Sequence, residues 1–131
     1  MYFQDHSIYS YSAENELKNG VNIGWLSSKI PFNTGQTSIH FKNKLFDIIY
    51  LRQSNIMRGI HECDFCESKR EIFIGRDDRN VLLGYGEIWI PSIDNDAIYV
   101  SPTLIYHYIK QHNYLPPDSY IESVLAFDLN S

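Results

Sequence analysis

The two cysteines of this 131-residue chain, Cys63 and Cys66, are the feature that most limits how it folds. They are its only cysteines, and they stand in the pattern C-x-x-C. A turn of this kind places two sulfurs on one side of a tight loop, as a tetrahedral zinc ion requires at about 2.3 Å per Zn–S bond. Without a visible export signal, such a pair favours a metal site in a reducing compartment over a disulfide. The chain must then bring further ligands to this loop.

Histidines are the expected remaining ligands. His107 and His112 have the spacing H-x4-H, which lies within the range of zinc fingers. Five residues on an ideal helix turn about 140° beyond a full circle, so both imidazoles reach one ion only if the helix ends at His112. Asn113 favours such an end. His61 is an alternative, because in an extended segment it points to the same side as Cys63. We predict a zinc site with these ligands: Cys63, Cys66, His107 and His112, or His61 as the alternative ligand.

Other chemistry is compatible with part of this pattern. In a thioredoxin-like redox pair, Asp64 between the cysteines would raise the thiol pKa rather than lower it. A zinc deaminase requires H-x-E and P-C-x-x-C sequences, which the chain lacks. A hydrolytic zinc with three ligands, a bound water and Glu62 or Glu87 as base is the main alternative to a structural site. Without a metal, the cysteines are small apolar residues and His107 is a hydrogen-bonded core histidine.

We expect residues 1–131 to form a single zinc-stabilised domain. Hydrophobic periodicity predicts three helices in it. Residues 37–54 contain neither Gly nor Pro and carry apolar side chains at helical spacing. Thr37 or Ser38 supplies the N-cap oxygen of this long helix. Ser101-Pro102 indicates the start of a second helix, because proline suits the first helical position. The third helix follows two prolines near the C-terminus, at 118–127.

Four stretches predict the strands of a small, mainly antiparallel sheet in an α+β fold: 21–26, 71–74, 81–90 and 97–100. The last three form a meander after the cysteine loop, and the first adds an N-terminal strand. Gly84 and Gly86 indicate a bulge or a close backbone approach within the long strand. Glu87 either orients a ligand histidine or faces solvent, and we favour the solvent-facing position. Residues 1–20 form a short edge strand or a loosely held arm.

The formal net charge of −5 limits the partners that this chain can bind. An acidic protein has little non-specific affinity for nucleic acid or anionic membranes, and no run approaches the ~20 apolar residues of a membrane span. We expect a cytoplasmic, non-enzymatic module that binds a basic protein partner, such as an immunity or antitoxin-type protein. A small zinc-dependent hydrolase is the alternative.

Residues 58–124 resemble a family of small bacterial proteins of unknown activity. The family pattern runs R-G-x-H-x-C-x-x-C, then G-x-E-I, then L-I-x-H-Y-I-x-x-H-x-Y-x-P-P. The chain matches it at these positions: Arg58, Gly59, His61, Cys63, Cys66, Gly86, Glu87, Ile88, Leu104, Ile105, His107, Tyr108, Ile109, His112, Tyr114, Pro116 and Pro117. The order of knuckle, hairpin and histidine-bearing helix is also similar to a treble-clef zinc finger, although His107 follows one turn later. The resemblance implies that cysteines and histidines form one unit.

Overall fold

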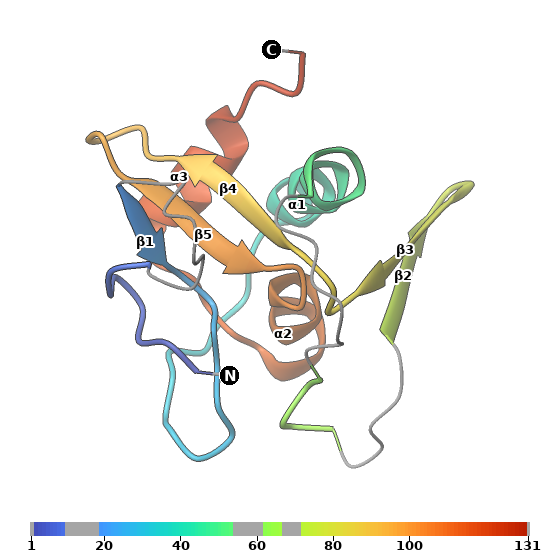
Figure 1. Ribbon diagram of the computed structural model, residues 1–131. Coiled ribbons are helices and arrows are strands. Elements are labelled where there is room, and N and C mark those ends of the chain that lie inside the picture. Colours follow the sequence, from blue (N-terminus) through green and yellow to red (C-terminus); the bar gives the residue numbers. More distant parts are fainter. Residues whose placement is uncertain (1, 10–18, 54–61, 67–71, 131) are drawn as a thin grey trace.

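The computed structural model describes residues 2–9, 19–53, 62–66 and 72–130 of the chain. These residues include three helices and five strands (Figure 1), in this order: β1 (Gly20–Asn22), α1 (Ile39–Arg52), β2 (Ile72–Arg76), β3 (Arg79–Leu83), β4 (Glu87–Pro91), β5 (Ile98–Pro102), α2 (Ile105–His112) and α3 (Asp118–Ala126). The fold is α+β, as the sequence predicts.

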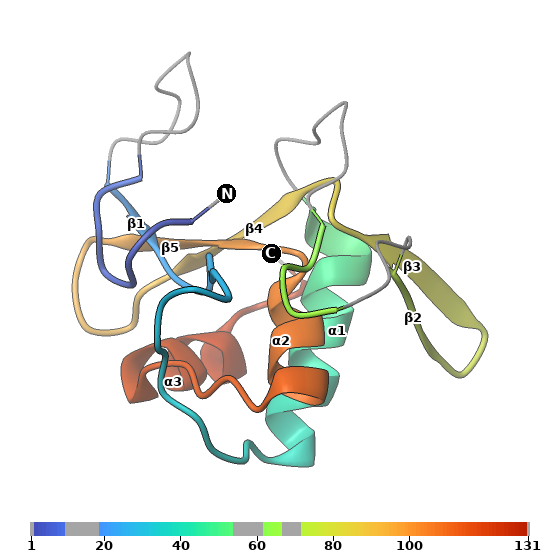
Figure 2. The ribbon, with the colours of Figure 1, turned by 90° about the horizontal axis from the view of Figure 1, so that it is seen from below.

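The three helices lie on one side of a three-stranded sheet with the order β1-β5-β4 (Figure 2). β4 is antiparallel to β5, and β1 is parallel to it. β2 and β3 form a separate antiparallel hairpin beside α1. The core between the sheet and the helices consists of fully buried side chains that include Phe41, Leu45, Ile88, Ile105 and Val124. This packing fixes α2, which carries two of the predicted metal ligands, against the sheet.

The predicted meander is wrong in one respect, because the strand expected at 81–90 is interrupted. Gly84 has a φ of 97°, a conformation that breaks a strand and that glycine adopts without strain. Its N–H donates to Thr103 Oγ1 at 2.9 Å, while Thr103 N–H donates to the Gly86 carbonyl at 3.0 Å. These bonds take the place of strand pairing at residues 84–86. The chain therefore forms two separate hairpins, β2–β3 and β4–β5, which belong to different sheets.

The first and third helices are confirmed, and the second begins later than predicted. Ser38 Oγ caps α1 by accepting from Phe41 N–H at 3.1 Å. Ser101 and Pro102 are the last residues of β5, and α2 starts at Ile105 without a side-chain cap. Ser101 does not cap this helix, since its hydroxyl donates to Tyr120 Oη in the core. Tertiary hydrogen bonding therefore overrides the local signal for a helix start.

Residues 2–9 are bonded to the segment 20–25 and form one isolated bridge, Ile8 with Val21, but no strand. Phe3 N–H donates to Trp25 O at 3.1 Å, and Tyr9 N–H donates to Gly20 O at 2.9 Å. The strand predicted at 21–26 ends at Asn22, because Gly24 has a φ of 84°. Residues 10–18 lie outside the described part of the chain.

Candidate metal centre

Two distant parts of the chain meet at the predicted metal site. Cys63 and Cys66 lie in the described loop 62–66, and His107 and His112 lie on α2. One ligand atom from each of these four residues lies within 4.8 Å of the other three. The structure thus brings together the four residues ranked first from the sequence, and this group could hold a metal ion.

Four of the six distances between these atoms match those of a tetrahedron around one ion. Tetrahedral zinc with Zn–S of about 2.3 Å and Zn–N of about 2.05 Å separates a sulfur from a nitrogen by about 3.5 Å, and two nitrogens by about 3.4 Å. His112 Nε2 lies 3.5 Å from Cys63 Sγ and 3.7 Å from Cys66 Sγ. His107 Nε2 lies 3.3 Å from Cys66 Sγ and 3.2 Å from His112 Nε2. All four distances agree with the tetrahedral values to within roughly 0.3 Å.

The end of α2 allows both of its histidines to face one point. Asn113 adopts the left-handed conformation with a φ of 57°, as predicted, and stops the helix at His112. The N–H groups of Asn113 and Tyr114 both donate to the Tyr108 carbonyl, which closes the last turn. The two imidazole rings then lie with centroids 4.9 Å apart and planes at 73°. On an ideal helix, histidine side chains five positions apart would point in different directions. Here both imidazoles face the same point, because the helix ends at His112.

Phe65, between the two cysteines, attaches their loop to the body of the protein. Its ring packs edge-on against Phe32 and Tyr108, with centroids 5.4 and 5.8 Å away, and lies 5.0 Å from the His112 ring. Aromatic pairs of this geometry each contribute about 0.5–1.5 kcal/mol beyond their buried area. These ring contacts join the loop between the two cysteines to Phe32 and to α2.

Burial sets the protonation of these groups when no metal is bound. It raises the pKa of the Cys63 thiol to about 11 and, together with the neighbouring His112 charge, lowers the pKa of His107 to about 4. Burial also lowers the pKa of His112. The imidazoles are therefore neutral at pH 7, which is the form that binds a metal, whereas Cys63 keeps its proton until a cation displaces it.

Neither of the two candidate carboxylates, Glu62 and Glu87, belongs to this group of four ligand atoms. His61 lies outside the described residues. Glu62 is exposed. Glu87 is only 1% exposed, so the solvent-facing position expected for it is wrong. Its Oε1 accepts from Tyr9 Oη at 2.7 Å and from Trp89 Nε1 at 2.8 Å, which places it in a separate polar cluster.

A cleft of about 410 Å³ opens beside the candidate metal centre. Cys66, His107 and His112 line it from one side, together with Lys110. The opposite side is the strand β2, from Ile72 to Gly75. No spacing in the sequence indicates this cleft, because it exists only where the β2–β3 hairpin packs near α2.

The comparisons with known proteins identify a family and no activity. The model of a family described as a domain of unknown function, DUF7919, matches residues 1–125. No curated protein and no solved structure matches the chain. The resemblance to treble-clef fingers stays a prediction. No helix in the described part of the chain has the length and apolar character needed to cross a bilayer.

Proposed function

The chain belongs to the DUF7919 family of domains of unknown function, and we propose that in this member Cys63, Cys66, His107 and His112 bind one structural zinc ion. The protein stabilised in this way is a non-enzymatic module that binds another protein. The tetrahedral spacing of two sulfurs and two nitrogens from distant parts of the chain is the observation that carries this proposal. Thiolate and imidazole donors suit zinc and exclude the oxygen-seeking Mg²⁺ and Ca²⁺.

Zinc at this position would act on folding. It would join the loop 62–66 to the end of α2, and its binding energy would be available only to the folded chain. The aromatic contacts of Phe65 with Phe32 and Tyr108 add to the attachment of this loop. Two neutral imidazoles and two thiolates would leave a zinc complex without net charge.

A structural ion is favoured over the hydrolytic alternative because four protein ligands leave no position for water. The feature in favour of hydrolysis is the cleft, which Cys66, His107 and His112 line. A water-activating zinc also needs a base, and the two proposed carboxylates do not supply one. Glu87 is engaged by Tyr9 and Trp89. Glu62 is exposed and does not line the cleft.

The partner proposed for this module is a basic protein, in the manner of an intracellular immunity or antitoxin-type protein. A net charge of −5 attracts such a partner over distances of about one Debye length. Ten tyrosines, a residue type enriched in protein interfaces, add to this support.

Elemental analysis of the purified protein tests the metal, with cobalt substitution as a second readout. We expect one zinc per wild-type chain, none in Cys66→Ser, and one in the control His40→Gln, which changes an exposed histidine of α1. A cobalt-loaded protein should show the intense visible absorption of tetrahedral sulfur ligation, unchanged by azide. Zinc-free wild-type protein would refute the proposal, and a spectrum that shifts with azide would favour the hydrolase.

A further inference from the structure

The β2–β3 hairpin is closed by a turn whose geometry sets the direction of every backbone group in β2. The turn Asp77–Asp78 joins Arg76 to Arg79, with a φ of 58° at Asp77. A two-residue hairpin turn closes with a hydrogen-bonded pair, here Arg76 and Arg79. Since hydrogen-bonded and non-hydrogen-bonded pairs alternate along an antiparallel ladder, every second residue of β2 directs its N–H and C=O away from β3.

The outward-directed residues of β2 are Phe73 and Gly75. In the register they face Leu82 and Asn80 as non-hydrogen-bonded pairs, so their N–H and C=O groups point to the edge of β2 that lies away from β3. Within the described residues, no loop or helix backbone bonds to these groups. They form a row of alternating donors and acceptors at the spacing of a β-strand.

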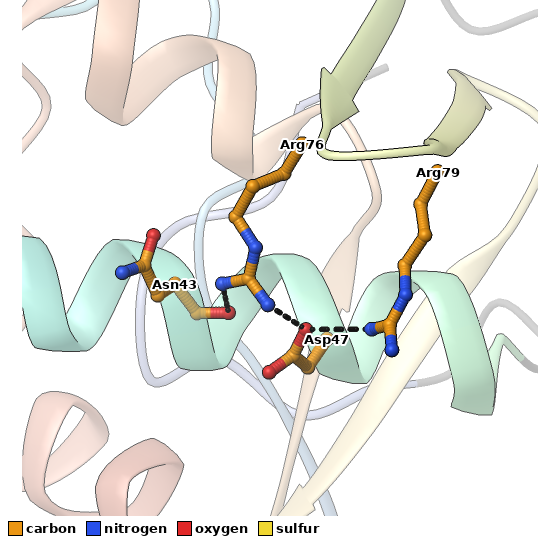
Figure 3. A network of polar contacts seen from close by, with 4 residues as sticks. All are labelled: Asn43, Asp47, Arg76 and Arg79. Atoms are coloured by element: carbon orange, nitrogen blue, oxygen red, sulfur yellow. Dashed lines mark hydrogen bonds and ion pairs between the residues drawn. The ribbon is translucent and has the colours of Figure 1, made fainter.

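Contacts between the β2–β3 hairpin and α1 keep this edge in place. Arg76 donates to Asp47 Oδ1 at 2.6 Å and to the Asn43 carbonyl at 3.2 Å, and Arg79 donates to the same Asp47 oxygen at 3.2 Å (Figure 3). The Arg76 guanidinium also lies over the Phe46 ring, 5.4 Å from its centroid. These contacts hold the hairpin against α1 and so fix the direction of the β2 edge that lies away from β3.

Among the described residues that line the cleft, the charged side chain is that of Lys110. Lys110 contributes an exposed ammonium, which lies 5.9 Å from the centroid of the Tyr106 ring. No Asp or Glu is among the described residues that line the cleft, and the proposed zinc complex adds no net charge. Phe73, 65% exposed, provides an apolar surface at the rim. The described lining of the cleft therefore differs in sign from the chain as a whole, whose net charge is −5.

We propose that β2 and this cleft bind an extended segment of a partner protein, which adds to β2 as a strand and places an acidic side chain against Lys110. The N–H and C=O groups of Phe73 and Gly75, which bond to no backbone group of the described loops and helices, specify an extended backbone. Only a polypeptide strand offers complementary groups at the same spacing. The charge of the cleft selects a carboxylate. This inference rests on the proposed protein-binding function. A partner with an overall basic charge can bind this cleft if the added strand carries one acidic residue.

A single segment fits the cleft better than a second copy of the chain does. Pairing through β2 of another copy would insert a two-stranded hairpin, about 10 Å wide at about 4.8 Å per strand. The volume of about 410 Å³ lies in the range of sites for short ligands, roughly 300–1,000 Å³. An added strand needs about three residues to bond with both outward-directed positions.

Selection from a phage-displayed library of random linear peptides tests this inference on zinc-loaded full-length protein. We expect enriched peptides that carry an Asp or Glu next to alternating apolar residues. For the strongest synthetic peptide, Lys110→Glu should weaken binding at least tenfold, whereas the control Lys29→Glu, an exposed change of equal charge outside the cleft, should alter it less than twofold. Equal loss in both variants, or no enrichment, would overturn the inference.

Two further readouts separate strand addition from a general charge effect. The amide protons of Phe73 and Gly75 should exchange at least tenfold more slowly when the peptide is bound, and methylation of the peptide's central backbone nitrogen should abolish binding. Unchanged exchange at both amides would contradict the proposal. Zinc content is measured in each variant: absence of zinc from the wild type refutes the proposed function, whereas zinc-loaded protein that binds no peptide refutes only the strand-addition site.

Discussion

Removing one ligand of the candidate metal centre should cost the protein its zinc-dependent stability. Cys66 and His107 are 41 positions apart. A cross-link that closes a loop of this length lowers the conformational entropy of the unfolded chain, which stabilises the folded state by about 4 kcal/mol at 25 °C. Mass action gives a similar value, about 4 kcal/mol, when free zinc exceeds its dissociation constant about a thousandfold. For a chain of this size, that free energy corresponds to a rise in Tm of roughly 12–20 °C.

Thermal unfolding of His112→Gln, followed by circular dichroism with zinc and with EDTA, measures this contribution. Wild type should lose roughly 12–20 °C on chelation, and the variant should melt in zinc near the temperature of chelated wild type. His112 is partly exposed, and its ring lies 5.0 Å from the Phe65 ring, so the substitution should change the chelated Tm only slightly. The control His40→Gln, on the exposed side of α1, should keep the full zinc-dependent rise.

Two results would refute this reasoning. A wild-type Tm that chelation leaves unchanged would show that no metal stabilises the fold, whatever the spacing of the donors. A His112→Gln variant that retains the whole zinc-dependent rise would show that zinc binds elsewhere in the chain.

Three other perturbations test the energetics of the fold. Zinc-free protein should lose stability as the pH falls from about 6.5 toward 4. Burial lowers the pKa of His107 to about 4 in the folded state, so the unfolded chain binds a proton at a higher pH than the folded chain does. Urea titrations at pH 7.5 and pH 4.5 measure this loss. Asp47→Asn should lower the free energy of unfolding by about 1 kcal/mol, since the two arginines that it binds are partly exposed, and urea denaturation measures it. Gly24→Ala should lower the free energy of unfolding by about 1–3 kcal/mol, because the φ of Gly24 is 84° and a Cβ would lie 2.6 Å from Ile105 Cδ1. A Tm unchanged by this substitution would contradict the expected strain at position 24.

The parts of the fold that depend on local sequence could be predicted. Residues 39–52 form the expected helix, because its apolar spacing and the Ser38 cap act within a few residues. The pairing of the cysteine loop with the histidines also follows from local features, namely the spacing of the ligand types and the stop at Asn113. Both kinds of signal are independent of how the rest of the chain packs.

The parts that depend on distant partners could not be predicted. Ser101 has the local signature of a helix cap, but its hydroxyl is used by Tyr120, 19 positions away. Glu87 reads as a solvent-facing charge until Tyr9, 78 positions earlier, donates to it in the core. The break at Gly84 likewise follows from a bond to Thr103. Tertiary partners decide these positions, and single-sequence patterns do not reveal them.

X-ray absorption at the zinc edge of the purified protein tests the central claim most directly. If the loop cysteines and the α2 histidines share one ion, the first shell should contain two sulfurs at about 2.3 Å and two nitrogens at about 2.0–2.1 Å. The imidazoles should also produce the outer-shell scattering typical of histidine ligands. A shell with fewer than two sulfurs, or one composed of oxygen and nitrogen alone, would contradict the joint coordination of zinc by Cys63, Cys66, His107 and His112.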